Sequence, residues 1–312
     1  MLNLCLALVI GFLPGLQEST DKRELRYRLE KGRVLEIRME QKMSLKLKEI
    51  PVEFEEMIGD EPLKLDFTGT IVATVSAVDE KGTATLTGKF TKASATGTVF
   101  VEDVEFEYDA ENPDALEEDD NEGGNPLGLD PASMFRQLVT ETLTFEIDSL
   151  GRMTQKNVTE ENRLPFQISS LNGMMGPLPR EKVGTGDRWK SKERISLPGM
   201  EQVQINLRAE NTVEKFTKVG DEDCVVIRTK FRVATAGDEG AEVEPGDGMF
   251  EFEAKMTGGG AGTTTFSIST GRPKTSSCKI DVNIAASMAN PQGDDDLEFK
   301  ALFRISQKFQ VR

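Results

Sequence analysis

Apolar and polar residues alternate with period two along much of the chain. Between residues 25 and 47 one parity is apolar and the other is largely charged. The apolar positions are Leu25, Tyr27, Leu29, Leu35, Ile37, Met39, Met43, Leu45 and Leu47. Successive side chains of a strand point to opposite sides, so this pattern predicts β-strands. Glu30-Lys31-Gly32 interrupts the alternation at a place where a hairpin turn or a bulge fits.

The alternation returns in several later segments, which are rich in Val, Ile, Phe and Thr. These segments are residues 71–75, 99–108, 203–207, 250–256, 280–284 and 299–311. Such residues favour strands. One apolar face and one charged face together predict an antiparallel sheet with one side in water.

Two parts of the sequence repeat each other in the same order. Residues 144–152 (TFEIDSLGR) are echoed by residues 265–272 (TFSISTGR), and residues 74–90 are echoed by residues 212–231 around Gly82 and Gly220. A β unit of this size cannot cover its own apolar face, so two copies side by side predict one continuous layer. We therefore expect a mainly β fold, a duplicated antiparallel twisted sheet or half-barrel, with halves at residues 20–180 and 181–312.

Two segments have helical patterns and are expected to cover the sheet. Asp130-Pro131 offers an N-cap and a first-turn proline for a helix over residues 130–142. A second helix is expected over residues 165–175, ending at Gly176-Pro177. Their apolar side chains are candidates for lining a ligand site, with plain core packing as the alternative. These candidates are Met134, Phe135, Leu138, Phe166, Leu171, Met174 and Met175.

The first residues resemble an export signal. Residues 2–16 are nearly all apolar, are too few to span a bilayer, and precede the charged Asp21-Lys22-Arg23. This pattern predicts a signal peptide over residues 1–19 and a periplasmic or extracellular location. Because no Lys or Arg precedes the apolar run, the alternatives are that the given start is internal or that the segment is an ordinary buried strand. No other stretch is apolar enough to cross a membrane.

Removal of a signal peptide would leave two cysteines, Cys224 and Cys278. They fall in different expected strands, and an oxidising compartment permits a disulfide between them. Two buried free thiols are the alternative.

The charge balance excludes some partners. With 54 acidic and 38 basic residues the formal net charge is -16, which opposes binding to nucleic acid and to anionic lipid surfaces. Residues 109–129 are strongly acidic and poor in apolar residues, which predicts a disordered insert.

Candidate catalytic groups are scarce. The chain contains no histidine, which removes Ser-His and Cys-His pairs and imidazole metal ligands. Ser276 and Lys279 match Ser-x-x-Lys, but they fall in an expected strand and lack the companion motifs of penicillin-binding enzymes. A carboxylate-based hydrolase remains a third hypothesis, with no particular acid pair to support it.

Metal and phosphate motifs are also weak. Residues 119–130 partly match a calcium loop, but position 5 is Gly123 and the final Glu is replaced by Asp130. The glycine run at residues 258–262 lacks the Lys and Ser/Thr of a phosphate loop and is expected to be a flexible connection. Gly184 to Trp189 is expected to be a tight turn before a strand, with Trp189 anchoring the core. We expect no cofactor and no metal.

Glycine turns, strand residues and a Gly-Asp-x-Trp element together resemble an uncharacterised family of exported bacterial proteins. The resemblance rests on Leu25-Arg26-Tyr27 with Gly32, Val75-x-x-Val78 with Gly82-x-Ala84, Asp148-Ser149-Leu150-Gly151, Leu178-Pro179 with Val183-Gly184, and Gly186-Asp187-x-Trp189. It implies an exported protein and carries no established activity. A twisted sheet with helical cover is also similar to the half-barrels of periplasmic lipoprotein carriers.

The leading functional hypothesis is a non-catalytic exported β protein that binds a lipid or another apolar ligand on its concave face. The alternative is an interaction module of the cell envelope that uses sheet edges and the acidic insert. The two hypotheses imply an apolar small molecule and an envelope protein as partners, respectively.

Overall fold

The computed structural model describes residues 21–49, 62–99, 102–112, 136, 139–156, 177–197, 200–233, 252–288 and 297–312. Most of these residues lie in strands. The strands are β1 (Val34–Glu49), β2 (Leu63–Val78), β3 (Ala84–Val99), β4 (Glu102–Asp109), β5 (Leu143–Ile147), β6 (Met153–Lys156), β7 (Arg188–Leu197), β8 (Met200–Val219), β9 (Glu222–Val233), β10 (Phe252–Ser267), β11 (Arg272–Met288) and β12 (Leu297–Val311).

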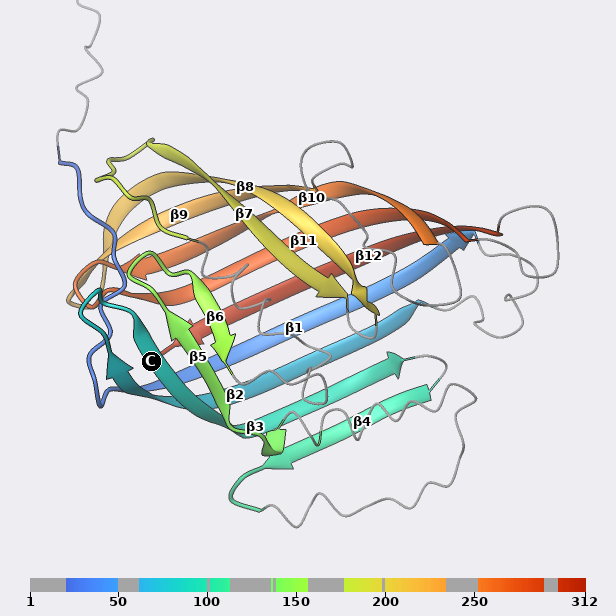
Figure 1. Ribbon diagram of the computed structural model, residues 1–312, viewed down its shortest axis with the longest axis horizontal. Helices are drawn as coiled ribbons and strands as arrows, with labels where there is room; N and C mark the ends of the chain where they lie inside the picture. Colours follow the sequence, from blue (N-terminus) through green and yellow to red (C-terminus); the bar gives the residue numbers. More distant parts are fainter. Residues whose placement is uncertain are drawn as a thin grey trace, which may run out of the picture.

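The strands form one antiparallel 12-stranded sheet in the order β6-β5-β3-β2-β1-β12-β11-β10-β9-β8-β7, with β4 also paired to β3. The sheet is curved and twisted, and in the described residues β6 and β7 are its open ends (Figure 1). The expected mainly β fold, a twisted antiparallel sheet or half-barrel, is confirmed: the strands form one antiparallel sheet that does not close into a barrel. The first strand β1 pairs with the last strand β12, so the middle of the sheet joins the two ends of the described chain.

Burial follows the alternation of the sequence. In β2, for example, Leu65, Phe67, Gly69, Ile71, Ala73 and Val75 are buried, while the residues that alternate with them are more exposed. A curved sheet encloses its concave face, so the buried side chains lie there and the convex face meets water.

The convex face carries cross-strand ion pairs. Lys42 lies 2.6 Å from Asp66, Lys308 lies 3.1 Å from Glu40, and Lys300 lies 2.6 Å from Glu49. These pairs join β1 to its neighbours β2 and β12. Each exposed pair contributes little to stability, but together they keep this face charged.

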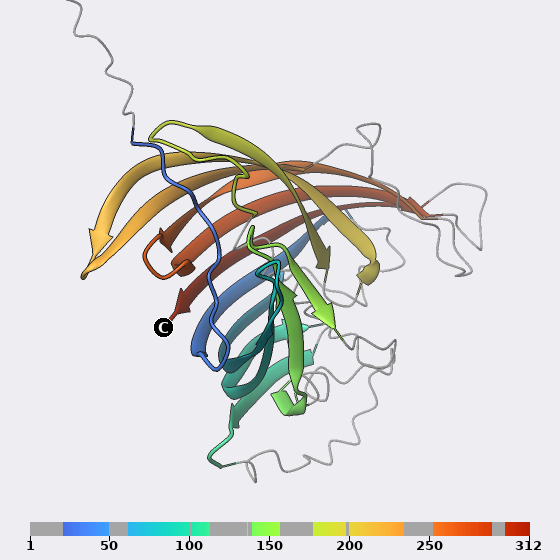
Figure 2. The same ribbon diagram turned by 60° about the vertical axis from the view of Figure 1, so that its left-hand side comes forward.

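Residues 21–33 form an extended segment that we call the strap. The alternation there predicted a strand from residue 25, but β1 begins only at Val34, after a turn at residues 31–32. The alternation persists because Leu25 and Tyr27 are buried while their neighbours are more exposed. Figure 2 shows the strap in blue crossing one end of the sheet.

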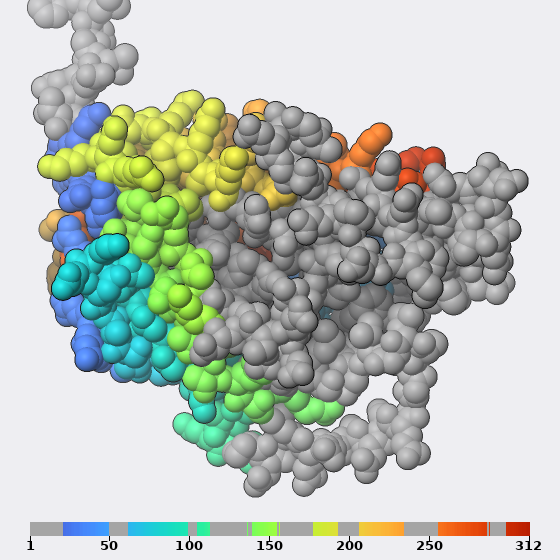
Figure 3. Space-filling model, viewed as in Figure 1, coloured from blue at the N-terminus to red at the C-terminus, as the bar shows by residue number. Residues whose placement is uncertain are grey.

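Backbone hydrogen bonds tie the strap to both halves of the sheet. The Tyr27 N–H donates to the Ser149 carbonyl at 2.8 Å, in the turn between β5 and β6. The Arg28 N–H donates to the Gly271 carbonyl at 3.0 Å, in the turn between β10 and β11. In Figure 3 the blue atoms at this end lie against yellow and green ones. The strap therefore holds two distant hairpins at a fixed separation.

The glycines of the sequence repeat occupy matching turns. Gly82 and Gly220 lie in the turns β2–β3 and β8–β9, and Gly151 and Gly271 lie in the turns β5–β6 and β10–β11. All four have positive φ, which favours glycine. The same order of hairpins thus occurs in both halves, and their origin by duplication stays a prediction.

The glycine run at residues 258–262 was predicted wrongly. It lies inside β10, where all five residues pair with β11 and residues 259–262 also pair with β9. A Cβ built on Gly260 would lie 2.0 Å from the Lys279 carbonyl oxygen, and one on Gly259 would lie 2.3 Å from the Phe231 carbonyl oxygen. The run allows the strands to approach more closely than larger residues permit.

The expected turn at residues 184–189 is confirmed. Gly186 has a φ of 87°, the Gly184 N–H donates to Asp187 Oδ2 at 2.9 Å, and β7 starts directly afterwards. The Trp189 indole N–H donates to the Pro177 carbonyl at 2.8 Å, and its ring packs partly buried against the core.

Several predictions fall wholly or partly outside the described residues. Of the helix expected over residues 130–142, the described Arg136, Val139 and Thr140 are helical, and Thr140 Oγ1 donates to the Arg136 carbonyl at 3.0 Å. The predicted start of the acidic insert, at residue 109, is wrong, because Asp109 is the last residue of β4 and its carboxylate lies 2.8 Å from Lys92 Nζ. The signal peptide at residues 1–19, the helix at residues 165–175 and the acidic loop at residues 119–130 lie outside the described residues. None of the helical residues described is part of a helix that is long and apolar enough to span a bilayer.

Candidate ligand-binding face

A row of polar side chains crosses the buried face of the sheet. Strand register places Asn211, Thr229, Gly262, Cys278, Gln307 and Gln41 opposite one another on β8, β9, β10, β11, β12 and β1. We call Gln41, Asn211, Thr229, Cys278 and Gln307 the polar row. All five are buried, in a face that is otherwise mostly apolar. Such a row requires hydrogen-bond partners inside the fold or on a ligand.

Most of the polar row is paired. Thr229 Oγ1 donates to Asn211 Oδ1 at 2.8 Å, and Asn211 Nδ2 donates to Ser191 Oγ at 3.2 Å. The Cys278 thiol lies 3.7 Å from Gln307 Oε1 and donates to it. A series of hydrogen-bonded side chains of this kind fixes the orientation of each amide group.

The unpaired group of the row is the amide nitrogen of Gln307. Gln307 is 3% exposed, and its Nε2 has no hydrogen-bond partner among the residues described. Its neighbour Gln41 donates from Nε2 to Met43 Sδ at 3.0 Å, and sulfur is a weak acceptor. A buried amide N–H without a partner costs free energy, so an acceptor supplied by a ligand would stabilise this site.

The row is uncharged. Burial raises the pKa of Cys278 to about 11, so its thiol stays protonated near neutral pH. The adjacent register row adds Thr264 and Ser276, whose hydroxyls lie 2.8 Å apart. The face thus offers neutral donors and acceptors to a neutral polar group, surrounded by apolar side chains.

Gly262 lies at the centre of the row, between Thr229 and Cys278. A Cβ there would meet the Ser277 carbonyl oxygen at 2.8 Å and the Cys278 Cβ at 3.1 Å. Glycine therefore leaves the row without a side chain on β10, the strand between the two paired sets.

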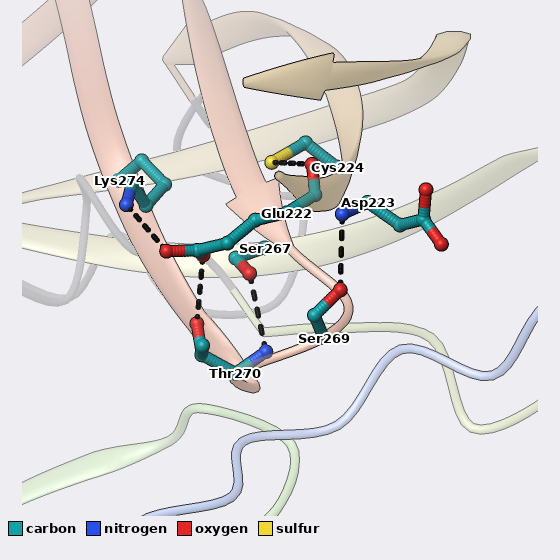
Figure 4. Close-up of polar contacts among 7 residues, drawn as sticks. All are labelled: Glu222, Asp223, Cys224, Ser267, Ser269, Thr270 and Lys274. Carbon is teal, nitrogen blue, oxygen red and sulfur yellow. Dashed lines mark hydrogen bonds and ion pairs between the residues drawn. The ribbon is translucent and has the colours of Figure 1, made fainter. Parts of the chain in front are cut away.

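A second polar cluster joins the turns β8–β9 and β10–β11 (Figure 4). Glu222 lies 2.8 Å from Lys274 and accepts a hydrogen bond from Thr270 Oγ1 at 3.2 Å. Hydrogen bonding from Lys274 and then from Ser267 lowers the pKa of Glu222 to about 2, so this carboxylate stays ionised at neutral pH. The Asp223 N–H donates to Ser269 Oγ at 2.9 Å. These contacts hold the two turns together and leave the carboxylate fully engaged.

The two cysteines are not bridged. Cys224 and Cys278 are both free and buried, so the disulfide considered from the sequence does not form. Register explains why, because Cys278 is level with Thr229, five residues along β9 from Cys224, or roughly 16 Å of strand. Disulfides require Cα atoms within about 7 Å.

Ser276 and Lys279 do not form a catalytic pair. Ser276 is buried on β11, and Lys279 is exposed on the same strand. Residues three apart in a strand lie on opposite faces. In the described part of the chain, no group of three or more Cys, Asp and Glu side chains is placed to hold a metal ion.

The ligand-lining residues predicted from the sequence cannot be placed on this face. Met134, Phe135, Leu138, Phe166, Leu171, Met174 and Met175 all lie outside the described residues. The polar row was missed. Its only sequence signal is a polar residue at an apolar position of each alternating strand, such as Gln41 between Met39 and Met43.

No protein-family model matches the chain, and no curated protein is significantly similar to it. The resemblance to an uncharacterised exported family therefore stays a prediction.

Proposed function

We propose that this protein is an exported, non-catalytic binding protein that holds a lipid or another apolar ligand on the concave face of its sheet. The proposal is supported by an open, curved sheet whose buried face is mostly apolar. The observation that carries it is the unpaired Gln307 amide in the polar row. An apolar ligand with one hydrogen-bond acceptor, such as an ester or amide carbonyl, complements this surface.

The first test is to identify what the protein carries. Freshly isolated protein is analysed by native mass spectrometry and by solvent extraction of bound lipids. We expect co-purifying lipid that a fluorescent fatty acid displaces. Absence of lipid together with absence of fatty-acid binding would refute the proposal.

A matched pair of variants tests the role of Gln307. Gln307→Leu removes the buried amide, whereas Gln310→Leu removes the same group on the exposed side of β12. We expect Gln307→Leu to weaken fatty-acid binding about 2- to 10-fold, the range of one hydrogen bond, and Gln310→Leu to leave it unchanged. Equal affinities for the two variants would remove Gln307 from the site.

A further inference from the structure

Arg272 is a buried cation without a counter-ion. It is 8% exposed, and its Nε is enclosed and has no hydrogen-bond partner among the residues described. Fourteen ion pairs occur among the described residues, and none of them includes Arg272. An enclosed guanidinium N–H without an acceptor costs free energy, because its hydrogen bond to water has been lost.

Glu222 is the acid whose charge acts on Arg272, and the two form no ion pair. Glu222 feels the charge of Arg272, but its two oxygens are taken by Lys274 at 2.8 Å and Thr270 at 3.2 Å. Burial lowers the pKa of the Arg272 guanidinium, and the positive charge of Arg33 lowers it further. The surroundings of Arg272 are thus short of negative charge.

Two other arginines lie at the same end of the sheet. The backbone of Arg28 in the strap bonds to Gly271, the residue before Arg272, and a Cβ on Gly271 would lie 2.6 Å from the Arg28 backbone nitrogen. Arg33 precedes β1, and only the end of β12 separates the start of β1 from the start of β11. None of the ion pairs among the described residues includes the side chain of Arg28 or of Arg33.

We propose that Arg272, with Arg33, forms a binding site for an oxyanion of the phosphate class. A phosphate group accepts several hydrogen bonds from guanidinium groups, and Arg suits it because its N–H groups form a planar fork. The anion would supply the negative charge that Arg272 lacks. This site is separate from the polar row, because the two have different residues and opposite preferences for charge.

The test is titration of the full chain with inorganic phosphate at constant ionic strength, followed by calorimetry and by the thermal unfolding midpoint. We expect saturable binding and a rising midpoint. Arg272→Gln should weaken phosphate binding by at least about tenfold, as loss of one partner of a buried charge pair does. Arg33→Gln, at a half-buried position, should weaken phosphate binding less. This variant still tests the site if Arg272→Gln does not fold. Arg228→Gln, an exposed arginine paired with Glu214, is the control without effect.

Vesicles separate a free anion from a lipid headgroup. If phosphatidylglycerol vesicles bind in an Arg272-dependent manner and inorganic phosphate does not, the oxyanion is a headgroup. If inorganic phosphate binds alone, it is a free anion. Absence of both interactions, or unchanged binding by Arg272→Gln, overturns the proposal.

A stability measurement distinguishes binding from a structural role. In phosphate-free buffer, Arg272→Met should leave the unfolding midpoint unchanged or raise it, because it removes an uncompensated buried charge. Addition of phosphate should raise the unfolding midpoint of the wild type and leave that of Arg272→Met unchanged. A loss of several degrees in both buffers would show that Arg272 supports the fold, and the proposal would fail.

Discussion

The two halves of the buried face use one register row in different ways. On β8 to β12 and β1 the row consists of Asn211, Thr229, Gly262, Cys278, Gln307 and Gln41. On β2, β3 and β4 it continues as Phe67, Ala95 and Phe106. The backbone pairing is uninterrupted between the two parts, but the side chains change from polar to apolar.

This difference suggests separate roles for the two halves, one in the stability of the fold and the other in ligand binding. The apolar half packs rings, with Phe67 and Phe90 edge to face at a centroid distance of 6.1 Å. A Cβ on Gly69 would meet the Phe90 ring at 2.8 Å, so that space is already filled. The polar half gives up apolar burial and retains an unpaired amide. We infer that the apolar half mainly stabilises the fold and that the polar half is the place for a ligand.

The largest expected effect comes from truncating the apolar half. Phe67→Ala should lower the free energy of unfolding by about 3–5 kcal/mol, because it empties a packed site. Thr229→Val in the polar half keeps the shape but breaks the bond to Asn211, and should cost about 1–3 kcal/mol. Urea unfolding of both variants measures the difference. Equal losses would contradict the division between the two halves.

A second comparison concerns two turns with the same hydrogen-bonding pattern, only one of which contacts the strap. Asp79 and Asp148 each accept two backbone N–H bonds at Oδ1, and Gly82 and Gly151 have φ angles of 81° and 83°. A Cβ on Gly151 would lie 2.3 Å from the Tyr27 ring, whereas one on Gly82 would meet only Ser149, at 3.9 Å.

Gly151→Ala should therefore cost about 2–4 kcal/mol, from backbone strain plus displacement of Tyr27. Gly82→Ala should cost about 1 kcal/mol, from strain alone. Thermal and urea unfolding compare the two variants. A similar cost for both would mean that the strap contributes little to holding the hairpins.

The Glu222 cluster predicts a dependence of stability on pH. Because hydrogen bonds lower the pKa of Glu222 from 4.5 to about 2, its ionised form stabilises the fold above pH 4.5, and this contribution is lost as the pH falls toward 2. Between pH 4.5 and pH 2 the free energy of unfolding of the wild type should fall by on the order of 2 kcal/mol more than that of Glu222→Gln.

Urea unfolding at a series of pH values gives the two stability curves. Glu214→Gln, at an exposed acid paired with Arg228, serves as the control and should follow the wild type. Parallel curves for the wild type and Glu222→Gln would disprove the role of this cluster.

The smallest effect is expected on the convex face. Lys308→Ala removes an ion pair with Glu40 in which both side chains are more than half exposed. It should cost less than about 1 kcal/mol, and added salt should shrink the difference. A loss comparable to that of Phe67→Ala would show that the charged face stabilises the sheet as much as the apolar one.

The sequence predicted what depends on local pattern. Alternation located most strands, and Gly184 to Trp189 was correctly interpreted as a turn. The start of β1 was wrong because the strap also alternates: Leu25 and Tyr27 are buried, but the strap backbone bonds to hairpin turns at Ser149 and Gly271. The glycine run was wrong because strand propensity disfavours glycine, whereas close approach to β9 and β11 requires it.

The candidate site could not be predicted because it depends on register between distant strands. Gln41 and Gln307 lie at opposite ends of the chain and become neighbours only when β1 pairs with β12. Arg272 similarly looks like an ordinary residue after a turn. Its unusual status arises from burial and from the commitment of Glu222 to Lys274, neither of which is a property of local sequence.

The pairing of β1 with β12 has a consequence for biosynthesis. A ribosome delivers β12 after every other described strand, so until that moment β1 and β11 both have open edges. Closing the centre joins strands with a very large separation in sequence, which slows folding and leaves those edges available for mispairing. Among the described strands the last to be synthesised completes the middle of the sheet, and this is the stage at which a chaperone would be most useful.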